Sequence, residues 1–222
     1  MKRDWKERLW NGRAALLFVL AAGWLLPWRP ELISSYNLET LLSATALLAV
    51  LAIGQSFVMI SGGIDLSLPA VISACSVAGT ALIAPGGPLA DAGWGVPAAV
   101  SIMLIVGTAI GAGQGIAVAY LRMPPLLVSL TTLMFVSGTA LWATQSNRYA
   151  TSAEFNQLWY GRFAGVPLAL PAIAVMILVA HLAMSRTLFG RRLYAIGQNA
   201  VAARIAGLPV ARTVAVSYAI SG

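Results

Sequence analysis

The 222 residues are 59% hydrophobic and only 9% charged, whereas about a quarter of an ordinary soluble domain is charged. This composition excludes a soluble fold, which could not hide so much apolar surface. The formal net charge is +7, but the basic residues are scattered between apolar blocks, which argues against a nucleic-acid-binding protein. We therefore predict an all-α, polytopic transmembrane helix bundle that forms a single domain over residues 1–222.

Apolar blocks close to spanning length recur along the chain, and about 20 helical residues cross the hydrocarbon core of a bilayer. We expect a seventh span to begin near Thr213, after six complete spans at residues 14–28, 40–60, 68–84, 96–121, 126–144 and 167–184. The first block resembles a secretory signal but lacks a small-residue cleavage site, so we interpret it as an uncleaved span. Because the last apolar segment stops at Gly222, we expect the natural C-terminal part to be missing.

The basic residues predict the orientation of the bundle. With a cytoplasmic N-terminus, eleven of the 14 Lys and Arg residues fall in inside segments and three in outside segments. Such a bias is typical of the positive-inside rule. We therefore predict a cytoplasmic basic N-terminus at 1–13, a periplasmic loop at 145–166 and a cytoplasmic loop at 185–212.

Two glycines interrupt the apolar pattern between the second and third predicted spans. Gly62 and Gly63 should end one helix, and Asp65 or Ser67 should cap the next, with Pro69 in its first turn. The simple interpretation is a capped turn. The functional interpretation is that an acidic residue beside unwound backbone lines a translocation pathway or gate.

Other residues within the predicted spans also suggest contacts. Gln55 and Gln114 could hydrogen-bond a solute hydroxyl in the same pathway, or they could bond neighbouring helices; both interpretations stay open. Gly107, Gly111 and Gly115 recur every fourth residue, and this pattern predicts a face that packs closely against another helix.

The run GQSFVMISGGIDLS at residues 54–67 resembles the signature of the ribose/xylose-type permeases in the branched-chain amino-acid/ribose ABC permease superfamily. Segments 115–130 and 190–208 are similar to two further family segments, in family order. The resemblance implies a permease subunit of a binding-protein-dependent ABC importer that moves a monosaccharide or sugar-like solute across the bacterial inner membrane. It also implies three kinds of partner: ATPase subunits, a periplasmic solute-binding protein and a second permease subunit, identical or different.

The resemblance gives the loop at 185–212 a specific role. In such permeases a short cytoplasmic helix docks in a groove of the ATPase, and we expect that helix at residues 200–206. Its candidate coupling residues are Asn199 as the N-cap, Ala202, Ala203, Arg204 and Gly207 as the end.

Alternatives to this docking role remain. The helix could be an ordinary interfacial helix, and the arginines of the loop could bind lipid phosphate, namely Arg191, Arg192, Arg204 and Arg212. The chain also departs from the family pattern at Ala200 and Val201, where acidic residues are usual, so an ionic contact with the ATPase is not expected there.

The sequence lacks the patterns of an enzyme. Its only lysines are Lys2 and Lys6, so it has no phosphate-binding loop, and ATP must be hydrolysed by a separate subunit. Cys75 and His181 are the only residues of their types, so we predict no metal site, no catalytic residue and no cofactor.

Three other functions remain as alternatives. The chain could be a permease of the same superfamily for branched-chain amino acids or nucleosides. An ion-coupled secondary transporter is disfavoured, because the span interiors offer few ionisable groups beyond Asp65 and His181. An inactive permease fragment is the third.

Overall fold

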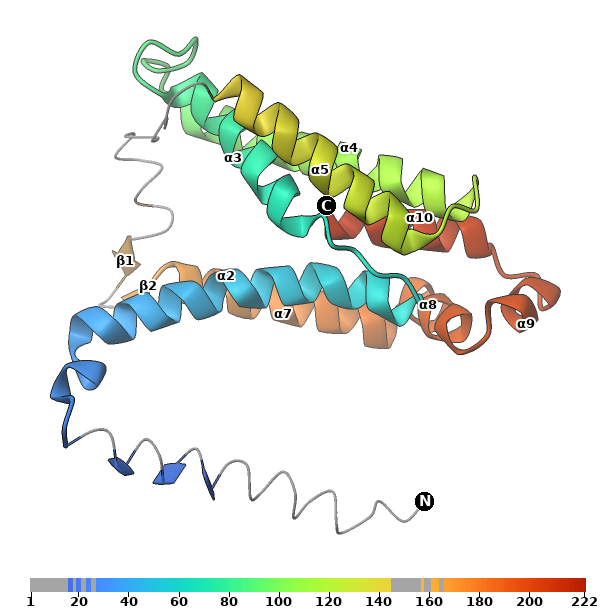
Figure 1. Ribbon diagram of the computed structural model, residues 1–222, viewed down its shortest axis with the longest axis horizontal. Helices are drawn as coiled ribbons and strands as arrows, with labels where there is room; N and C mark the ends of the chain where they lie inside the picture. The colour runs from blue at the N-terminus through green and yellow to red at the C-terminus, as the bar shows by residue number, and fades with distance from the viewer. Residues whose placement is uncertain are drawn as a thin grey trace. The chain divides into compact units, whose positions relative to one another are not determined.

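The computed structural model describes residues 16–17, 19–20, 23–24, 27–144, 157, 161–163 and 166–222. Its elements, in the chain order shown in Figure 1, are the 3-10 helix η1 (Pro30–Ile33), α2 (Ser35–Ile60), α3 (Leu68–Ile83), α4 (Gly95–Ala119), α5 (Pro125–Ala143), β1 (Arg162–Phe163), β2 (Val166–Pro167), α7 (Ala169–Arg186), α8 (Leu188–Gln198), α9 (Ala200–Ile205) and α10 (Val210–Ser221). The two short strands pair antiparallel. All other regular structure in these ranges is helical, which confirms the predicted fold class.

Within the described residues, four helices are long and apolar enough to cross a membrane, namely α2, α4, α5 and α7. They coincide, with small shifts of their ends, with four of the predicted spans. The apolar helices α3 and α10 are shorter, with 16 and 12 residues. The chain is therefore a multi-pass membrane protein. The span predicted at 14–28 lies mostly outside the described residues, and the total number of spans stays a prediction.

The chain forms two compact units, Met1–Thr45 and Ala46–Gly222. In the first unit, the side-chain amide of Asn37 in α2 donates to the carbonyl of Leu32 in η1 at 2.8 Å. The second unit contains every residue of the candidate site described below.

Proline sets the start of two helices in the second unit. Pro125 is the first residue of α5, and Pro69 lies in the first turn of α3. Proline is tolerated there because the N–H groups of the first turn have no partner within the helix.

The face of α4 that carries three glycines packs against α10. A Cβ on Gly115 would come within 2.6 Å of the carbonyl oxygen of Ala215. At Gly107 and Gly111 it would collide with backbone atoms at or just beyond the C-terminal end of α10. Because no side chain separates them, the two helices approach closely at these positions.

The segment predicted as a cytoplasmic loop at 185–212 is mostly helical. It contains α8, which the sequence analysis did not identify. The Thr187 hydroxyl caps this helix by accepting a hydrogen bond from the Gly190 N–H at 3.2 Å. The predicted outside segment at 145–166 lies mostly outside the described residues; β1 and the first residue of β2 are the regular structure described within it.

Candidate functional site

An extended turn joins α2 to α3, and Asp65 shapes it. Gly62 has φ +86°, a left-handed conformation that glycine adopts at little cost. The Oδ1 atom of Asp65 accepts hydrogen bonds from the backbone N–H of Ser67 at 2.8 Å and from its hydroxyl at 2.6 Å. Ser67 occupies the N-cap position of α3, as the sequence analysis allowed, but its side chain makes no bond to the first helical amides. The expected side-chain cap is therefore replaced by this local pairing.

Gln114 of α4 connects this turn to the helix bundle. Its Nε2 donates to the hydroxyl of Ser67 at 2.7 Å. Tyr218 of α10 is fully buried, and its hydroxyl lies over Gly63, where an added Cβ would come within 2.6 Å of it. We call Asp65, Ser67, Gln114 and Tyr218 the Asp65 cluster.

The Asp65 cluster is buried but incompletely hydrogen-bonded. Its four residues are each 4% exposed or less. Two of its atoms have no hydrogen-bond partner: Oδ2 of Asp65 and Oε1 of Gln114. Leaving one buried polar atom unpaired costs about 1–3 kcal/mol, so such groups are rare in a purely structural core. The arrangement leaves polar groups free to bind a solute hydroxyl or to change partners when the helices move.

Gln55 lies in α2, before the turn. It is half-buried, and its Oε1 atom has no hydrogen-bond partner. The neighbouring Gly54 faces the end of α10, where an added Cβ would come within 3.1 Å of the Ser221 carbonyl oxygen. The other predicted pathway residues lie together around the turn: Gly62, Gly63, Asp65, Ser67 and Gln114.

The short helix α9 has a well-defined start and end. The Oδ1 atom of Asn199 accepts hydrogen bonds from the N–H groups of Val201 at 3.0 Å and Ala202 at 2.9 Å. Gly207, with φ +77°, turns the chain after the helix. The helix ends at Ile205, one residue before the end predicted from the sequence.

The two sides of α9 differ in their surroundings. Ala203 is 5% exposed and packs with Ile196 of α8 and Val210 of α10. Val201 and Ile205 lie one helical turn apart and are 69% and 83% exposed. The sequence analysis singled out Ala203 and missed the two outward residues, although their i, i+4 spacing is visible in the sequence.

Helix α8, which precedes α9 in the chain, packs against the end of α2. Its Leu193 is fully buried and packs with Phe57 of α2 and Met184 of α7. Gly197 lies directly against the carbonyl oxygen of Ile60, the last residue of α2, which leaves no room for a side chain. A displacement of α8 would therefore act on the turn that carries Asp65.

The described residues contain no group of three or more His, Cys, Asp or Glu side chains that could hold a metal ion. His181 is exposed in α7. The Cys75 thiol of α3 donates to the carbonyl of Met103 in α4 at 3.2 Å, which is a contact between two helices.

The chain is similar to a family of transport permeases and to several of its members. A family profile described as "Branched-chain amino acid transport system / permease component" matches residues 37–222. The autoinducer 2 import system permease protein LsrC of Enterobacter sp. (strain 638) is 30% identical over 213 residues, which cover 94% of this chain and 60% of the relative. The xylose transport system permease protein XylH of Escherichia coli (strain K12) is 27% identical over 86% of this chain and 63% of the relative.

A third relative comes from another bacterium. The ribose import permease protein RbsC of Bacillus subtilis (strain 168) is 29% identical over 87% of this chain and 59% of the relative. The chain thus spans about 60% of the length of these curated relatives. No solved structure gives a significant match.

Proposed function

Because the chain belongs to the family described as "Branched-chain amino acid transport system / permease component", we propose that it is the membrane-spanning permease subunit of a binding-protein-dependent ABC importer in the bacterial inner membrane. The family match over residues 37–222 carries this proposal, and the apolar helices α2, α4, α5 and α7 agree with it. The chain itself is not an enzyme in this proposal and needs no cofactor. Separate ATPase subunits hydrolyse ATP, a periplasmic binding protein delivers the solute, and a second permease subunit completes the pathway.

The proposed solute is a monosaccharide or a sugar-like molecule. The relatives named for autoinducer 2, xylose and ribose support this class. The Asp65 cluster offers chemistry of the right kind, because a carboxylate, an amide and a phenol can each hydrogen-bond a hydroxyl group.

The test of this function is uptake by the protein together with its cognate binding protein and ATPase. Labelled ribose, xylose and galactose should enter proteoliposomes only when the binding protein and ATP are both present. Labelled leucine serves as the comparison solute, because the family description names branched-chain amino acids. Uptake of leucine without uptake of any sugar would reject the proposed solute class.

Helix α9 is proposed as the contact with the ATPase. Its outward residues Val201 and Ile205 form a small apolar surface, and exposed apolar surface of this kind is typical of a protein contact. Val201 occupies a position where related permeases usually carry an acidic residue, so the proposed contact is apolar and does not depend on an ion pair. Ala203 anchors α9 to α8 and α10, through which the motion of the ATPase would reach the bundle.

The double substitution Val201→Ser, Ile205→Ser tests this contact. Each side chain buried in an interface contributes about 1–2 kcal/mol, so the ATPase should bind the double variant at least tenfold more weakly, with a parallel loss of uptake. Leu188→Ser is the matched control, because Leu188 is 61% exposed but lies on α8. Equal ATPase binding by the double variant and the control would remove α9 from the interface.

The Asp65 cluster is proposed as part of the pathway or its gate. Movement of α8 would shift the end of α2 through Gly197, and movement of α10 would shift Tyr218 above Gly63. Both displacements converge on the turn held by Asp65 and Ser67. In this proposal the bond between Gln114 and Ser67 breaks when the pathway opens toward the cytoplasm.

The bond between Gln114 and Ser67 can be removed by Gln114→Leu. We expect this variant to insert normally into the membrane but to show altered transport. The hydrogen bond is present only before the pathway opens toward the cytoplasm, so its removal destabilises that state alone. Thr131→Val is the control, since the exposed Thr131 hydroxyl donates to the Leu127 carbonyl of its own helix, α5. Unchanged uptake and ATP turnover in Gln114→Leu would count against the gate.

A further inference from the structure

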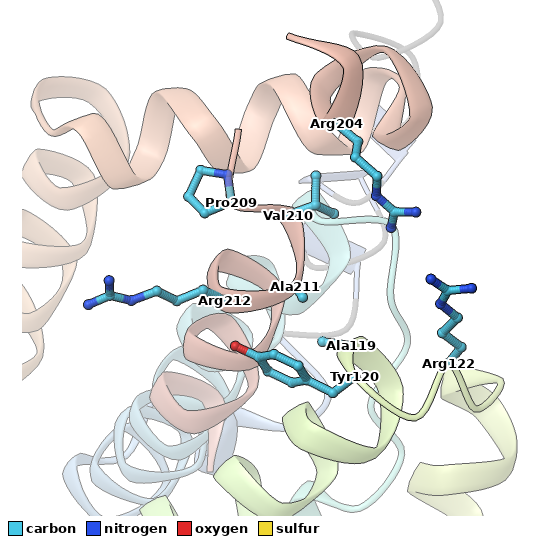
Figure 2. Close-up of a pocket in the computed structure, with 8 residues that line it drawn as sticks. All are labelled: Ala119, Tyr120, Arg122, Arg204, Pro209, Val210, Ala211 and Arg212. Atoms are coloured by element: carbon cyan, nitrogen blue, oxygen red, sulfur yellow. The ribbon is translucent and has the colours of Figure 1, made fainter. Parts of the chain in front are cut away.

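Two neighbouring hollows lie where the turn after α4 meets α9 and the start of α10. Their volumes are about 460 Å³ and about 320 Å³. They have five lining residues in common: Ala119, Arg122, Arg204, Val210 and Ala211. Figure 2 shows the larger hollow, with the side chains of Arg122 and Arg204 extending toward one another from two different elements. Arg212 also lines it but extends in another direction.

Among the described residues, no carboxylate lines the hollows beside the two facing guanidinium groups. Both arginine residues are exposed, so each keeps its donors available. Two like charges that face one another repel, and an anion placed between them relieves this repulsion.

The backbone at Arg122 is also unusual. Its φ of +57° lies in the left-handed region, which glycine normally occupies at the end of a helix. A non-glycine residue in this conformation costs about 1–2 kcal/mol. The chain therefore has a strained arginine where glycine would be more stable, and strain of this kind indicates a functional requirement for the side chain.

The surroundings of the two arginines also favour an anion. The first turn of α10 lines the hollow, and its N-cap residue Pro209 provides no side-chain cap. The Val210 N–H donates to the Leu208 carbonyl at 2.8 Å, and the N–H groups that follow it in the first turn favour negative charge. Tyr218, which is fully buried, lines the smaller hollow. Arginine pairs with phosphate through two parallel hydrogen bonds, which makes phosphate the best match for a pair of guanidinium groups.

We propose that Arg122 and Arg204 bind the headgroup phosphate of an anionic phospholipid in the cytoplasmic leaflet. The predicted orientation places both residues at the cytoplasmic boundary of the membrane, where anionic lipids attract basic side chains. Leu121 and Met123 flank Arg122 and are 67% and 47% exposed, so an apolar surface for the acyl chains adjoins the charged site. The proposal depends on the membrane location and orientation of the chain, and not on the solute that it carries.

The experiment measures lipid binding by the purified protein in detergent, without ATPase or binding protein. Dioctanoyl phosphatidylglycerol, dioctanoyl phosphatidylcholine and inorganic phosphate are titrated separately, and retained lipid is counted by native mass spectrometry. We expect phosphatidylglycerol to bind at least tenfold more tightly than phosphatidylcholine. Arg122→Gln and Arg204→Gln should each weaken phosphatidylglycerol binding about tenfold, because each removes charge-assisted hydrogen bonds.

Two further variants make the result specific. Arg122→Gly removes the charge and relieves the left-handed strain, so it should lose lipid affinity while becoming more stable, which separates binding from folding. Arg186→Gln removes one exposed positive charge from the same predicted side, outside both hollows, and should bind phosphatidylglycerol like the wild type.

Several results would overturn the proposal. Equal binding of the two lipids, or an equal loss in Arg186→Gln, would mean that the arginines provide only general positive charge. Inorganic phosphate that binds as tightly as phosphatidylglycerol would make free phosphate the ligand. Normal lipid binding combined with lost ATPase binding in the Arg122 and Arg204 variants would assign the site to an acidic protein surface.

Discussion

Two glycines in α4, Gly113 and Gly115, allow the contact between α4 and α10 to be measured with a single kind of substitution. An added Cβ at Gly113 has nothing within 4 Å, whereas at Gly115 it would lie 2.6 Å from the carbonyl oxygen of Ala215 in α10. Ordinary van der Waals contact begins at 3.4 Å, which is about 0.8 Å more than the 2.6 Å available at Gly115. To accommodate a Cβ there, the backbones of α4 and α10 must move apart by about this distance. The same change, glycine to alanine, is therefore free at one position and obstructed at the other.

The expected effects on stability have opposite signs. Alanine is favoured over glycine in a helix interior by about 0.5–1 kcal/mol, so Gly113→Ala should raise the free energy of unfolding by up to that amount. At Gly115 overpacking costs about 1–3 kcal/mol, which outweighs the gain in helix propensity. The two variants should therefore differ by about 2 kcal/mol.

Reversible unfolding of the protein from mild detergent micelles by sodium dodecyl sulfate, followed by tryptophan fluorescence, gives these free energies. Binding of α10 to α4 can be checked in the same samples by the loss of proteolytic protection in α10. If Gly115→Ala were as stable as Gly113→Ala, the close approach of the two helices would be wrong.

Three further substitutions test the local structures of the site. Asn199→Ala removes the cap of α9, and a loss of about 1 kcal/mol should speed hydrogen exchange of the Val201 and Ala202 amides about fivefold; unchanged exchange would reject the cap. Gly207→Ala places a side chain at φ +77° and should destabilise the protein by about 1–2 kcal/mol in the unfolding titration, whereas Gly207→Asn should cost less. Asp65→Ala removes both hydrogen bonds to Ser67 and should cost about 2–3 kcal/mol, while Asp65→Asn keeps an acceptor and should cost less; an equal loss would mean that charge, and not the acceptor, holds the turn.

Local signals in the sequence were enough to place most helices. Glycine at 62 and proline at 69 and 125 mark helix ends through backbone conformation; α2 ends and α3 begins as predicted, and α5 begins one residue before the predicted start. Asn199 and Gly207 define α9 in the same way. The start of α10 lies at Val210, three residues before the predicted Thr213, because an exposed arginine at 212 in its first turn interrupts the apolar pattern without interrupting the helix.

Helix α8 was missed for a related reason. Its buried residues Leu193 and Ile196 follow the adjacent Arg191 and Arg192, so the segment is not apolar enough to be identified as a span. The spacing of Phe189, Leu193 and Ile196 is nevertheless that of one helix face, and an amphipathic pattern would have identified it. A search for spans alone therefore overlooks helices that lie outside the bilayer core.

The Asp65 cluster was only half predictable. Asp65 and its glycines stand out because an acidic residue beside two glycines is rare in an apolar chain. Gln114 was predicted as a polar residue within a span, but its bond to Ser67, 47 residues away, was not predicted, and Tyr218 of α10 was not identified. No local pattern reports which helices pack together, so these contacts required the structure.

The central claim is that α9 is a cytoplasmic contact through which a separate ATPase drives the membrane helices. It is tested most directly by labelling Ile205→Cys, in a chain that also carries Cys75→Ser, with a membrane-impermeant maleimide. The account predicts labelling in inside-out vesicles, none in intact spheroplasts, and protection when the ATPase subunit is bound. Labelling from the periplasmic side would contradict it, because the proposed contact would then face away from any cytoplasmic ATPase.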